Sequence, residues 1–139
     1  MQTVRDGDGR RYLLVKRSGE SSLVRDPATG EERYVPNDRL ETVEDSPLSA
    51  AAGSVPGPTR RAVLAAHDER ALGLLVEVVD RGPVGVRTLL ADYDLCESDL
   101  HGLLAEFRAA GLIAETRVAG ERGYEATADG ERAVERLRD

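Results

Sequence analysis

The sequence has few of the residues on which enzymes, disulfide-bonded proteins and metalloproteins usually depend. Its 139 residues include no tryptophan, one cysteine (Cys96) and two histidines (His67 and His101). One cysteine excludes an internal disulfide and a cysteine zinc site, and the histidines lack a carboxylate or cysteine set at ligand spacing. No nucleophile–base–acid set and no glycine-rich phosphate loop stands out. We therefore expect no enzyme, no bound metal and no cofactor, and we interpret Cys96 as a small buried residue rather than a redox sensor.

Long apolar runs are also missing. No stretch approaches the 18 apolar residues that mark a membrane-spanning helix, and no apolar run follows Met1 as it would in a signal peptide. We expect a cytoplasmic protein with no membrane partner. Aromatic residues make up only 4% of the chain, so its core has to be built mainly from Leu, Val and Ala.

Lysine is almost absent as well. The 19 basic residues are arginines except for Lys16, and 26 acidic residues give a net charge of −7. Such acidity normally argues against a nucleic-acid partner, because phosphate binding needs a cationic surface. Abundant Asp and Glu with Arg in place of Lys is, however, typical of proteins from salt-loving archaea. In such proteins acidity reflects the solvent, so net charge does not exclude DNA here.

Charge divides the chain into three parts. Residues 1–45 and 60–139 are rich in charged side chains, whereas residues 46–59 carry none and contain three prolines with Gly, Ser and Ala. That composition does not favour regular structure, and we interpret 46–59 as a flexible linker. The fold class expected is α+β, with a small β-rich segment before the linker and a helical domain after it.

The first 45 residues are expected to form an antiparallel β meander. Turn-forming sequences such as Asp6-Gly7 and Pro27–Gly30 separate the strands. The strands are expected at residues 2–5, 10–17, 22–26 and 32–35. A sheet of this size buries little surface. We therefore expect it to pack against the second domain, a second copy of this chain or another protein.

Residues 60–139 change to helical periodicity. Asp68 is placed to cap a helix whose apolar stripe is Leu72, Leu75, Val76 and Val79, and Gly111 is placed to end a later one. In a final helix Ala133, Val134 and Leu137 are expected to face inward. The expected elements are helices at 59–66, 69–81, 86–93, 97–110 and 128–138, and hairpin strands at 112–118 and 124–127 around a turn at 119–123.

Residues 95–137 resemble the turn, recognition helix, wing and closing helix of MarR- and PadR-type winged helix-turn-helix regulators. The matching parts are Leu95 and Cys96, Gly111-Leu112-Ile113, the glycines Gly120 and Gly123, and Thr127–Gly130. The resemblance implies that the third helix enters the major groove while the hairpin touches the flanking backbone. The whole chain also resembles a haloarchaeal group of two-part proteins, a β-rich segment followed by a winged helix, which implies an origin and no activity.

The resemblance also supplies candidate DNA contacts. They lie on the third helix, around the wing and on the second helix: Ser98, His101, Gly102, Arg108, Arg117, Arg122 and Arg87. Against them stand Glu97, Asp99 and Glu106, which leave the third helix with a net charge of −2. Acids in the first turn favour the helix dipole, but they would also repel phosphate. The arginines could equally be salt-bridge partners of the many acids.

Two functions therefore remain open. One is a DNA-binding transcriptional regulator of winged-helix type, acting as a homodimer on double-stranded DNA. The alternative is a winged-helix protein–protein interaction module that does not bind DNA, with the β segment as a second docking surface for a protein partner. Positive potential that continues from the wing to the first helix favours DNA, and its absence favours protein.

Overall fold

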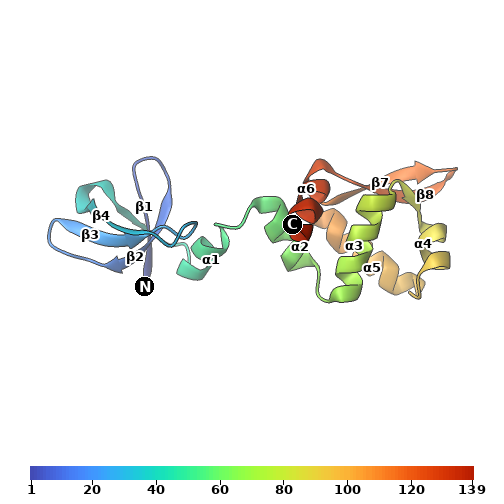
Figure 1. Ribbon diagram of the computed structural model, residues 1–139, viewed down its shortest axis with the longest axis horizontal. Helices are drawn as coiled ribbons and strands as arrows, with labels where there is room; N and C mark the ends of the chain where they lie inside the picture. Colours follow the sequence, from blue (N-terminus) through green and yellow to red (C-terminus); the bar gives the residue numbers. More distant parts are fainter. The chain divides into compact units, whose positions relative to one another are not determined.

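The computed structural model describes all 139 residues and divides the chain into two compact units, Met1–Pro56 and Gly57–Asp139 (Figure 1). Each unit has its own cluster of buried apolar side chains. The longest helices have 13 residues, and no helix combines the length and apolarity needed to cross a bilayer.

Unit 1, Met1–Pro56, contains a five-stranded antiparallel sheet. Its strands are β1 (Gln2–Arg5), β2 (Arg11–Lys16), β3 (Ser21–Arg25), β4 (Glu32–Pro36) and β5 (Glu41–Val43). The order in the sheet is β4-β3-β2-β1-β5. The first four strands agree with the meander expected from the sequence, whereas β5 is an addition. With three residues it is too short to show an alternating pattern, and it forms by pairing along β1, with Val43 opposite Thr3.

A short 3₁₀ helix, η1 (Asn37–Arg39), joins β4 to β5. The Asn37 amide nitrogen donates to the Ser18 carbonyl at 2.7 Å, and its amide oxygen accepts from the buried Ser22 hydroxyl at 2.5 Å. These bonds fasten η1 to the β2–β3 turn. Next to them the core of the unit is formed by Val4, Tyr12, Leu14 and Val24.

The expectation that residues 46–59 lack regular structure is wrong. Helix α1 (Pro47–Ala52) contacts β1 and β2 of unit 1, and helix α2 of the second unit begins at Gly57. Pro47 lies in the first turn of α1, where the missing N–H has no helical partner to lose. The alanines that follow are the best helix formers. The uncharged stretch does contain the boundary between the units, at Pro56.

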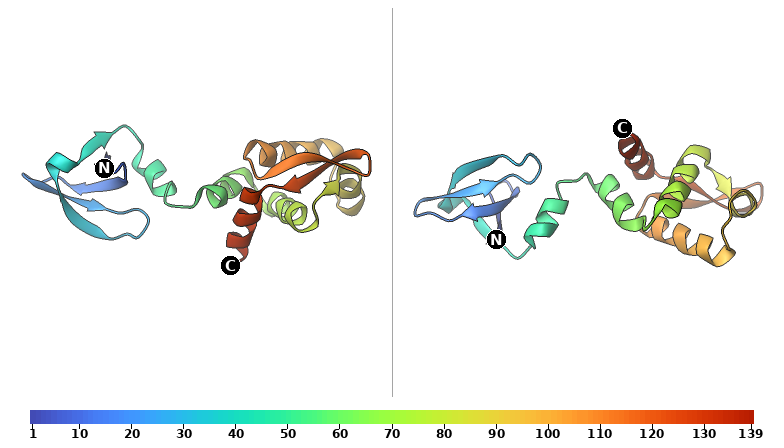
Figure 2. Two further views of the ribbon diagram at one scale, coloured as in Figure 1. Left: turned by 90° about the horizontal axis from the view of Figure 1, so that it is seen from above. Right: turned by 60° about the horizontal axis from the view of Figure 1, so that its bottom comes forward.

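Unit 2, Gly57–Asp139, packs five helices with a three-stranded sheet in the order β6-β8-β7. Its elements are α2 (Gly57–Ala65), α3 (Glu69–Arg81), β6 (Val84–Gly85), α4 (Val86–Asp92), α5 (Glu97–Ala109), β7 (Ile113–Val118), β8 (Glu121–Ala126) and α6 (Ala128–Arg138). Helices α3, α4 and α5 lie on one side of the β7–β8 hairpin (Figures 1 and 2). The helices follow the boundaries expected from the sequence to within about two residues.

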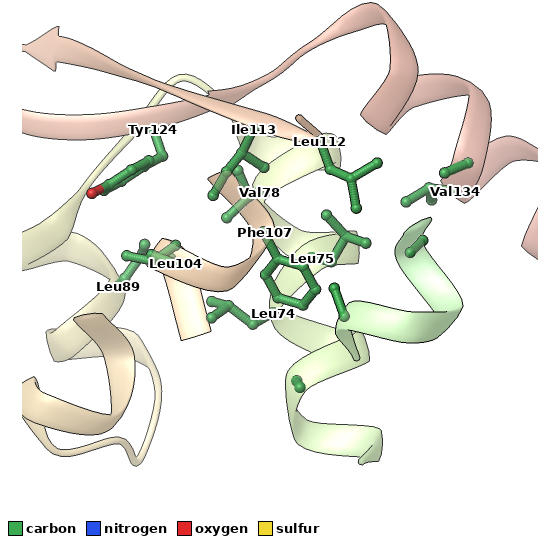
Figure 3. Close-up of a cluster of buried hydrophobic side chains, with 14 of the residues drawn as sticks. Leu74, Leu75, Val78, Leu89, Leu104, Phe107, Leu112, Ile113, Tyr124 and Val134 are labelled. Atoms are coloured by element: carbon green, nitrogen blue, oxygen red, sulfur yellow. The ribbon is translucent and has the colours of Figure 1, made fainter. Parts of the chain in front are cut away.

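The start of α3 and the end of α5 confirm the expected caps. The Asp68 carboxylate accepts from the Ala71 backbone N–H at 2.8 Å, and Gly111 has a φ of +76° directly after α5, the left-handed conformation typical of a C′ residue. The buried cluster of this unit, part of which appears in Figure 3, has Phe107 of α5 among its largest side chains.

The buried face of α3 differs from the expected one. Ala71, Leu74, Leu75 and Val78 are buried, whereas Leu72 is 37% exposed. Residues 71–79 are apolar except for Gly73 and Glu77, so the sequence supports two overlapping stripes, and packing selects the other one. Leu137 of α6 was likewise expected to point inward and is 42% exposed.

The hairpin turn is shorter than the sequence suggested. Ala119 and Gly120 alone form it, with φ angles of +50° and +81°, and Val118 pairs with Glu121. Positive φ at both central residues is the geometry of a two-residue hairpin turn. The expectation of a five-residue turn at 119–123 is therefore wrong. Arg122, expected at the tip, lies within β8.

Candidate nucleic-acid interface

One face of the β7–β8 hairpin gathers charged side chains next to α5. Glu115 is paired with Tyr124 and Arg117 with Arg122. Because side chains alternate along a strand and paired residues share a face, these four lie on the same side of the hairpin. Arg108, in the last turn of α5, places its Nη1 3.1 Å from Glu115. This side of the hairpin therefore adjoins α5.

Two grooves flank this contact. The first, of about 560 Å³, is lined by His101, Ala105, Arg108, Ala109, Arg122 and Tyr124. The second, of about 520 Å³, lies between α4, the start of α5 and the hairpin tip, and its lining includes Arg87, His101, Arg117 and Arg122. His101 and Arg122 line both. The structure thus brings together five of the seven residues selected from the sequence.

The other two selected residues, Ser98 and Gly102, are exposed on α5 but line neither groove. The Ser98 hydroxyl oxygen lies 3.4 Å from the Cys96 sulfur. A Cβ on Gly102 would meet no atom within 4 Å. The packing of the protein therefore does not require glycine at this position.

Most of the cations in the grooves face a carboxylate. Glu115 is shared between Arg108 and Arg122, whose Nε lies 2.7 Å away. Arg87 lies 3.8 Å from Glu121. Arg117 differs from these arginines: its Nη1 donates to the Gly120 carbonyl at 3.2 Å, and it forms no salt bridge.

The charge of this surface differs in sign from the charge of its surroundings. Four guanidiniums (Arg87, Arg108, Arg117 and Arg122) face three carboxylates (Glu97, Glu115 and Glu121). One positive charge is left over before His101 is counted. Residues 57–139 as a whole carry 11 arginines and 16 acids. The two grooves are thus locally cationic on an acidic unit.

Each acid of α5 lies beside an arginine or histidine side chain. Asp99 lies 3.7 Å from Arg70, and Glu106 lies 3.2 Å from His67 of the loop between α2 and α3. Glu97 lies 3.6 Å from His101, one turn further along the same helix. The acidity of α5 that argued against DNA is therefore directed partly towards residues of the protein itself.

Both units and both grooves lie inside one family match. A family of unknown function, DUF7346, matches residues 1–138. The chain belongs to this family. No curated protein and no solved structure matches it.

In this DUF7346 protein a polar network fixes the segment that precedes α5. The Tyr93 hydroxyl donates to Glu77 of α3 at 2.6 Å and accepts from Arg81 at 2.7 Å, and Arg81 also donates to Asp92 at 2.8 Å. The bond to the Glu77 carboxylate raises the pKa of Tyr93, because loss of the phenol proton would place two negative charges side by side. The network ties α3 to the end of α4 and so sets where α5 begins.

Cys96 caps α5 of the DUF7346 protein and is exposed, which corrects its interpretation as a buried residue. Its sulfur accepts from the Asp99 backbone N–H at 3.4 Å. An N-cap residue lies at the N-terminus of its helix, and the N-terminus of α5 faces solvent.

Sequence reasoning missed two residues of this surface, Glu115 and Tyr124. Glu115 binds two of the selected arginines, and Tyr124 lines the first groove. Their positions depend on the strand register, which the hairpin turn sets. A two-residue turn at Ala119-Gly120 places both residues on the same face of the hairpin as Arg117 and Arg122, whereas the expected five-residue turn does not.

Proposed function

We propose that Gly57–Asp139 form a winged helix-turn-helix domain and that the protein is a DNA-binding transcriptional regulator. In this proposal α4 and α5 are the helix-turn-helix pair, α5 is the recognition helix and the β7–β8 hairpin is the wing. The order of these elements resembles that of MarR- and PadR-type regulators, as do the capping residue, the Gly-Leu-Ile run and the glycine-containing hairpin of residues 95–137. The tight connection between α4 and α5 is the one such a pair needs.

The observation that carries the proposal is the local reversal of charge. Arginines from α4, α5, β7 and β8 line two adjoining grooves with an excess of positive charge, although the unit around them is acidic. A surface that binds a polyanion needs such an excess, because affinity comes largely from phosphate contacts. Salt-bridge pairing alone accounts for Arg87, Arg108 and Arg122, but not for Arg117.

Roles within the interface follow from position. The arginines at the grooves would contact phosphates and fix the orientation of the domain on the duplex. Ser98, His101 and Gly102 lie on the exposed side of α5 and would meet base edges in the major groove. Gly102 adds no side chain at a position where intramolecular packing leaves room, so it allows the α5 backbone to approach the bases closely.

A homodimer is part of the proposal. Helices α2 and α6 pack against each other and leave Val63, Leu64 and Leu137 exposed, with Leu64 at 71%. Exposed apolar side chains on neighbouring helices favour a protein contact, and a second copy would double the number of DNA half-sites bound. Leu64→Glu should convert the dimer to a monomer in sedimentation equilibrium. A wild-type monomer would contradict this part of the proposal.

A protein–protein adaptor is the second candidate, and a specific observation favours it. The first turn of α5 carries Glu97 and Asp99, and in unit 1 Tyr34 on the edge strand β4 is 59% exposed. Tyrosine is enriched in protein interfaces, and an acidic helix turn is complementary to a basic partner surface. In this reading unit 1 supplies the second docking surface.

DNA binding distinguishes the two candidates. Fluorescence anisotropy with labelled fragments of genomic DNA should show binding that weakens as KCl rises, with a negative log–log slope set by the number of phosphate contacts. Recovery of crosslinked DNA from cells at their native salt should then give discrete sites. Absence of binding at every KCl concentration would favour the adaptor.

A further inference from the structure

The first groove has the composition of a site for a phosphate group. We propose that it binds one phosphate between Arg108, Arg122 and the Tyr124 hydroxyl, and that the Glu115 carboxylate competes with the phosphate for the two arginines. The proposal deepens the DNA-binding function by naming the group that this groove accepts. It rests on that function only for the source of the phosphate, because the chemistry of the groove stands by itself.

Tyr124 is the most informative residue of the groove. Its side chain is buried in the core of unit 2, with only 3% of the residue exposed. The hydroxyl forms no hydrogen bond within the protein, although Tyr124 lines the groove. Figure 3 shows the Tyr124 hydroxyl oxygen at the end of the side chain that points away from Ile113 and Leu112. Thr3 Oγ1 is the one fully buried side-chain oxygen or nitrogen without a hydrogen bond, so the Tyr124 hydroxyl reaches solvent in the groove. A phosphate oxygen there can replace water as its acceptor.

The cations around this hydroxyl come from two elements. Arg108 lies in the last turn of α5, and Arg122 lies on β8, two residues before Tyr124. Each guanidinium has five N–H donors in a planar fork that matches a phosphate. Arg108 uses Nη1 and Arg122 uses Nε for Glu115, which leaves other donors of both forks for a ligand. Ala105 and Ala109 line the groove between them and leave it open.

Glu115 shows what kind of ligand the two arginines accept. Its carboxylate bridges Arg108 at 3.1 Å and Arg122 at 2.7 Å, which are distances typical of charge-assisted hydrogen bonds. A phosphate likewise presents two oxygens to these donors. It carries one negative charge in the DNA backbone and nearly two in a free phosphate or monoester. When no ligand is bound, Glu115 therefore holds the two arginines in position. Its negative charge also repels an incoming phosphate, and so lowers the affinity of the groove for phosphate.

Phosphate could come from two sources, the backbone of DNA or a free phosphorylated small molecule. Both present the same tetrahedral oxygens to the groove. The first source makes the groove part of the DNA interface, and the second makes it an effector site beside that interface. The binding of inorganic phosphate and of DNA, measured separately, distinguishes these two sources.

The test uses the full-length protein and four sequences: wild type, Tyr124→Phe, Glu115→Gln and Glu125→Gln. Inorganic phosphate is titrated at constant ionic strength and followed by the NMR amide shifts of α5 and β8. Tyr124→Phe keeps the ring and loses only the hydroxyl, so phosphate affinity should fall about tenfold. Glu115→Gln removes the competing charge, and affinity should rise about three- to tenfold.

Glu125→Gln is the matched control. It removes the same charge from the same hairpin, but residue 125 lies one position from Tyr124 and so on the opposite face. Phosphate affinity should stay at the wild-type value. An equal rise with Glu115→Gln and Glu125→Gln would show a general effect of net charge and would overturn the competitor role. Unchanged affinity with Tyr124→Phe would remove the hydroxyl from the site.

The same variants, measured with duplex DNA, separate this proposal from the function. Parallel changes for phosphate and DNA place a backbone phosphate in the groove. Phosphate binding that responds to the variants in a protein that binds no DNA supports the site and assigns it to a phosphorylated small molecule, while the DNA-binding function falls. DNA binding in the absence of any phosphate shift in α5 and β8 overturns the site and leaves the function intact.

Discussion

The Leu112 carbonyl oxygen lies only 2.0 Å from the place that a Cβ on residue 130 would occupy, so residue 130 has to be glycine. The close approach belongs to a junction where three segments meet. The Thr127 hydroxyl donates to the Gly111 carbonyl at 2.7 Å and accepts from the Gly130 N–H at 3.1 Å. Thr127 thereby caps α6 and holds the end of α5 at once. The spacing of Thr127 and Gly130 is thus explained by packing alone.

Gly130→Ala should therefore destabilise the protein. The new methyl group has to push α6 away from Leu112, and overpacking of this kind costs about 1–3 kcal/mol of the free energy of unfolding. Urea unfolding followed by far-UV circular dichroism measures the change. Gly73→Ala is the control: residue 73 is in the middle of α3 with open space around it, so alanine should stabilise by up to about 1 kcal/mol. Equal effects of the two changes would contradict the role given to Leu112.

Gly102→Ala separates stability from DNA binding. Alanine at this exposed position in α5 should raise the free energy of unfolding by about 0.5–1 kcal/mol, because no neighbour opposes a Cβ there. If α5 approaches the bases closely, the same methyl group should weaken DNA binding in anisotropy measurements. Gly73→Ala should give the same gain in stability with unchanged DNA affinity. A Gly102→Ala protein that is more stable and binds DNA as the parent does would place Gly102 outside the interface.

The sequence predicted the helices of unit 2 well because their ends carry explicit signals. Asp68 caps α3 and Gly111 follows α5 in the left-handed conformation, and both act through local backbone bonds that do not depend on tertiary structure. The buried face of α3 could not be predicted in the same way. Its apolar residues are nearly continuous, so the choice between stripes depends on what packs against them.

The sequence indicates which residues lie near the grooves, but it does not indicate which side chains pair there. Arg108, Arg117 and Arg122 lie close together because the hairpin directly follows α5 in the chain. The partners of these arginines depend on the strand register, which the two-residue turn at Ala119-Gly120 sets. Alanine seldom adopts a positive φ, so the sequence gives little sign of such a turn. A five-residue turn places Arg122 at the tip instead of within β8. Strand β5 and helix α1 were missed because each is short and forms by contact with β1 or β2.

Arg117→Ala should weaken DNA binding about equally for all sequences and lower the salt slope by roughly one unit. The guanidinium near the turn has no carboxylate partner and is free to meet a phosphate. Anisotropy at several KCl concentrations gives the slope. Arg132→Ala is the control, since Arg132 lies on α6 and pairs with Asp129. Ser98→Ala and His101→Ala should instead change sequence preference. A slope unaffected by Arg117→Ala would show that the wing does not touch DNA.

Limited proteolysis should cut first between α1 and α2. Gly53, Ser54, Val55 and Pro56 are exposed, lie outside both helices and precede the boundary between the units. A protease of broad specificity, such as subtilisin, should give two fragments that mass spectrometry assigns to the two units. First cuts within α1, or resistance of the whole 46–59 stretch, would contradict this division.

Thermal stability should rise with KCl into the molar range. The net charge of −7 opposes the compact state, and the repulsion extends over roughly 30 Å at 0.01 M salt but only about 3 Å at 1 M. Differential scanning calorimetry at increasing KCl measures the Tm of each transition. A Tm that is constant or falls with salt would argue against adaptation to high salt, and it would restore the net charge as evidence against a DNA partner.

The position of β1 between β2 and β5 has a consequence for how unit 1 folds. The pairs β1–β2, β2–β3 and β3–β4 are hairpins between neighbouring segments, whereas β1–β5 joins Thr3 to Val43 across almost the whole unit. Contacts between distant residues carry the largest loop-closure entropy and slow folding. The meander can therefore form while the chain is still being synthesised. We expect β5 to pair with β1 last. This pairing covers the edge of β1 that is free until then.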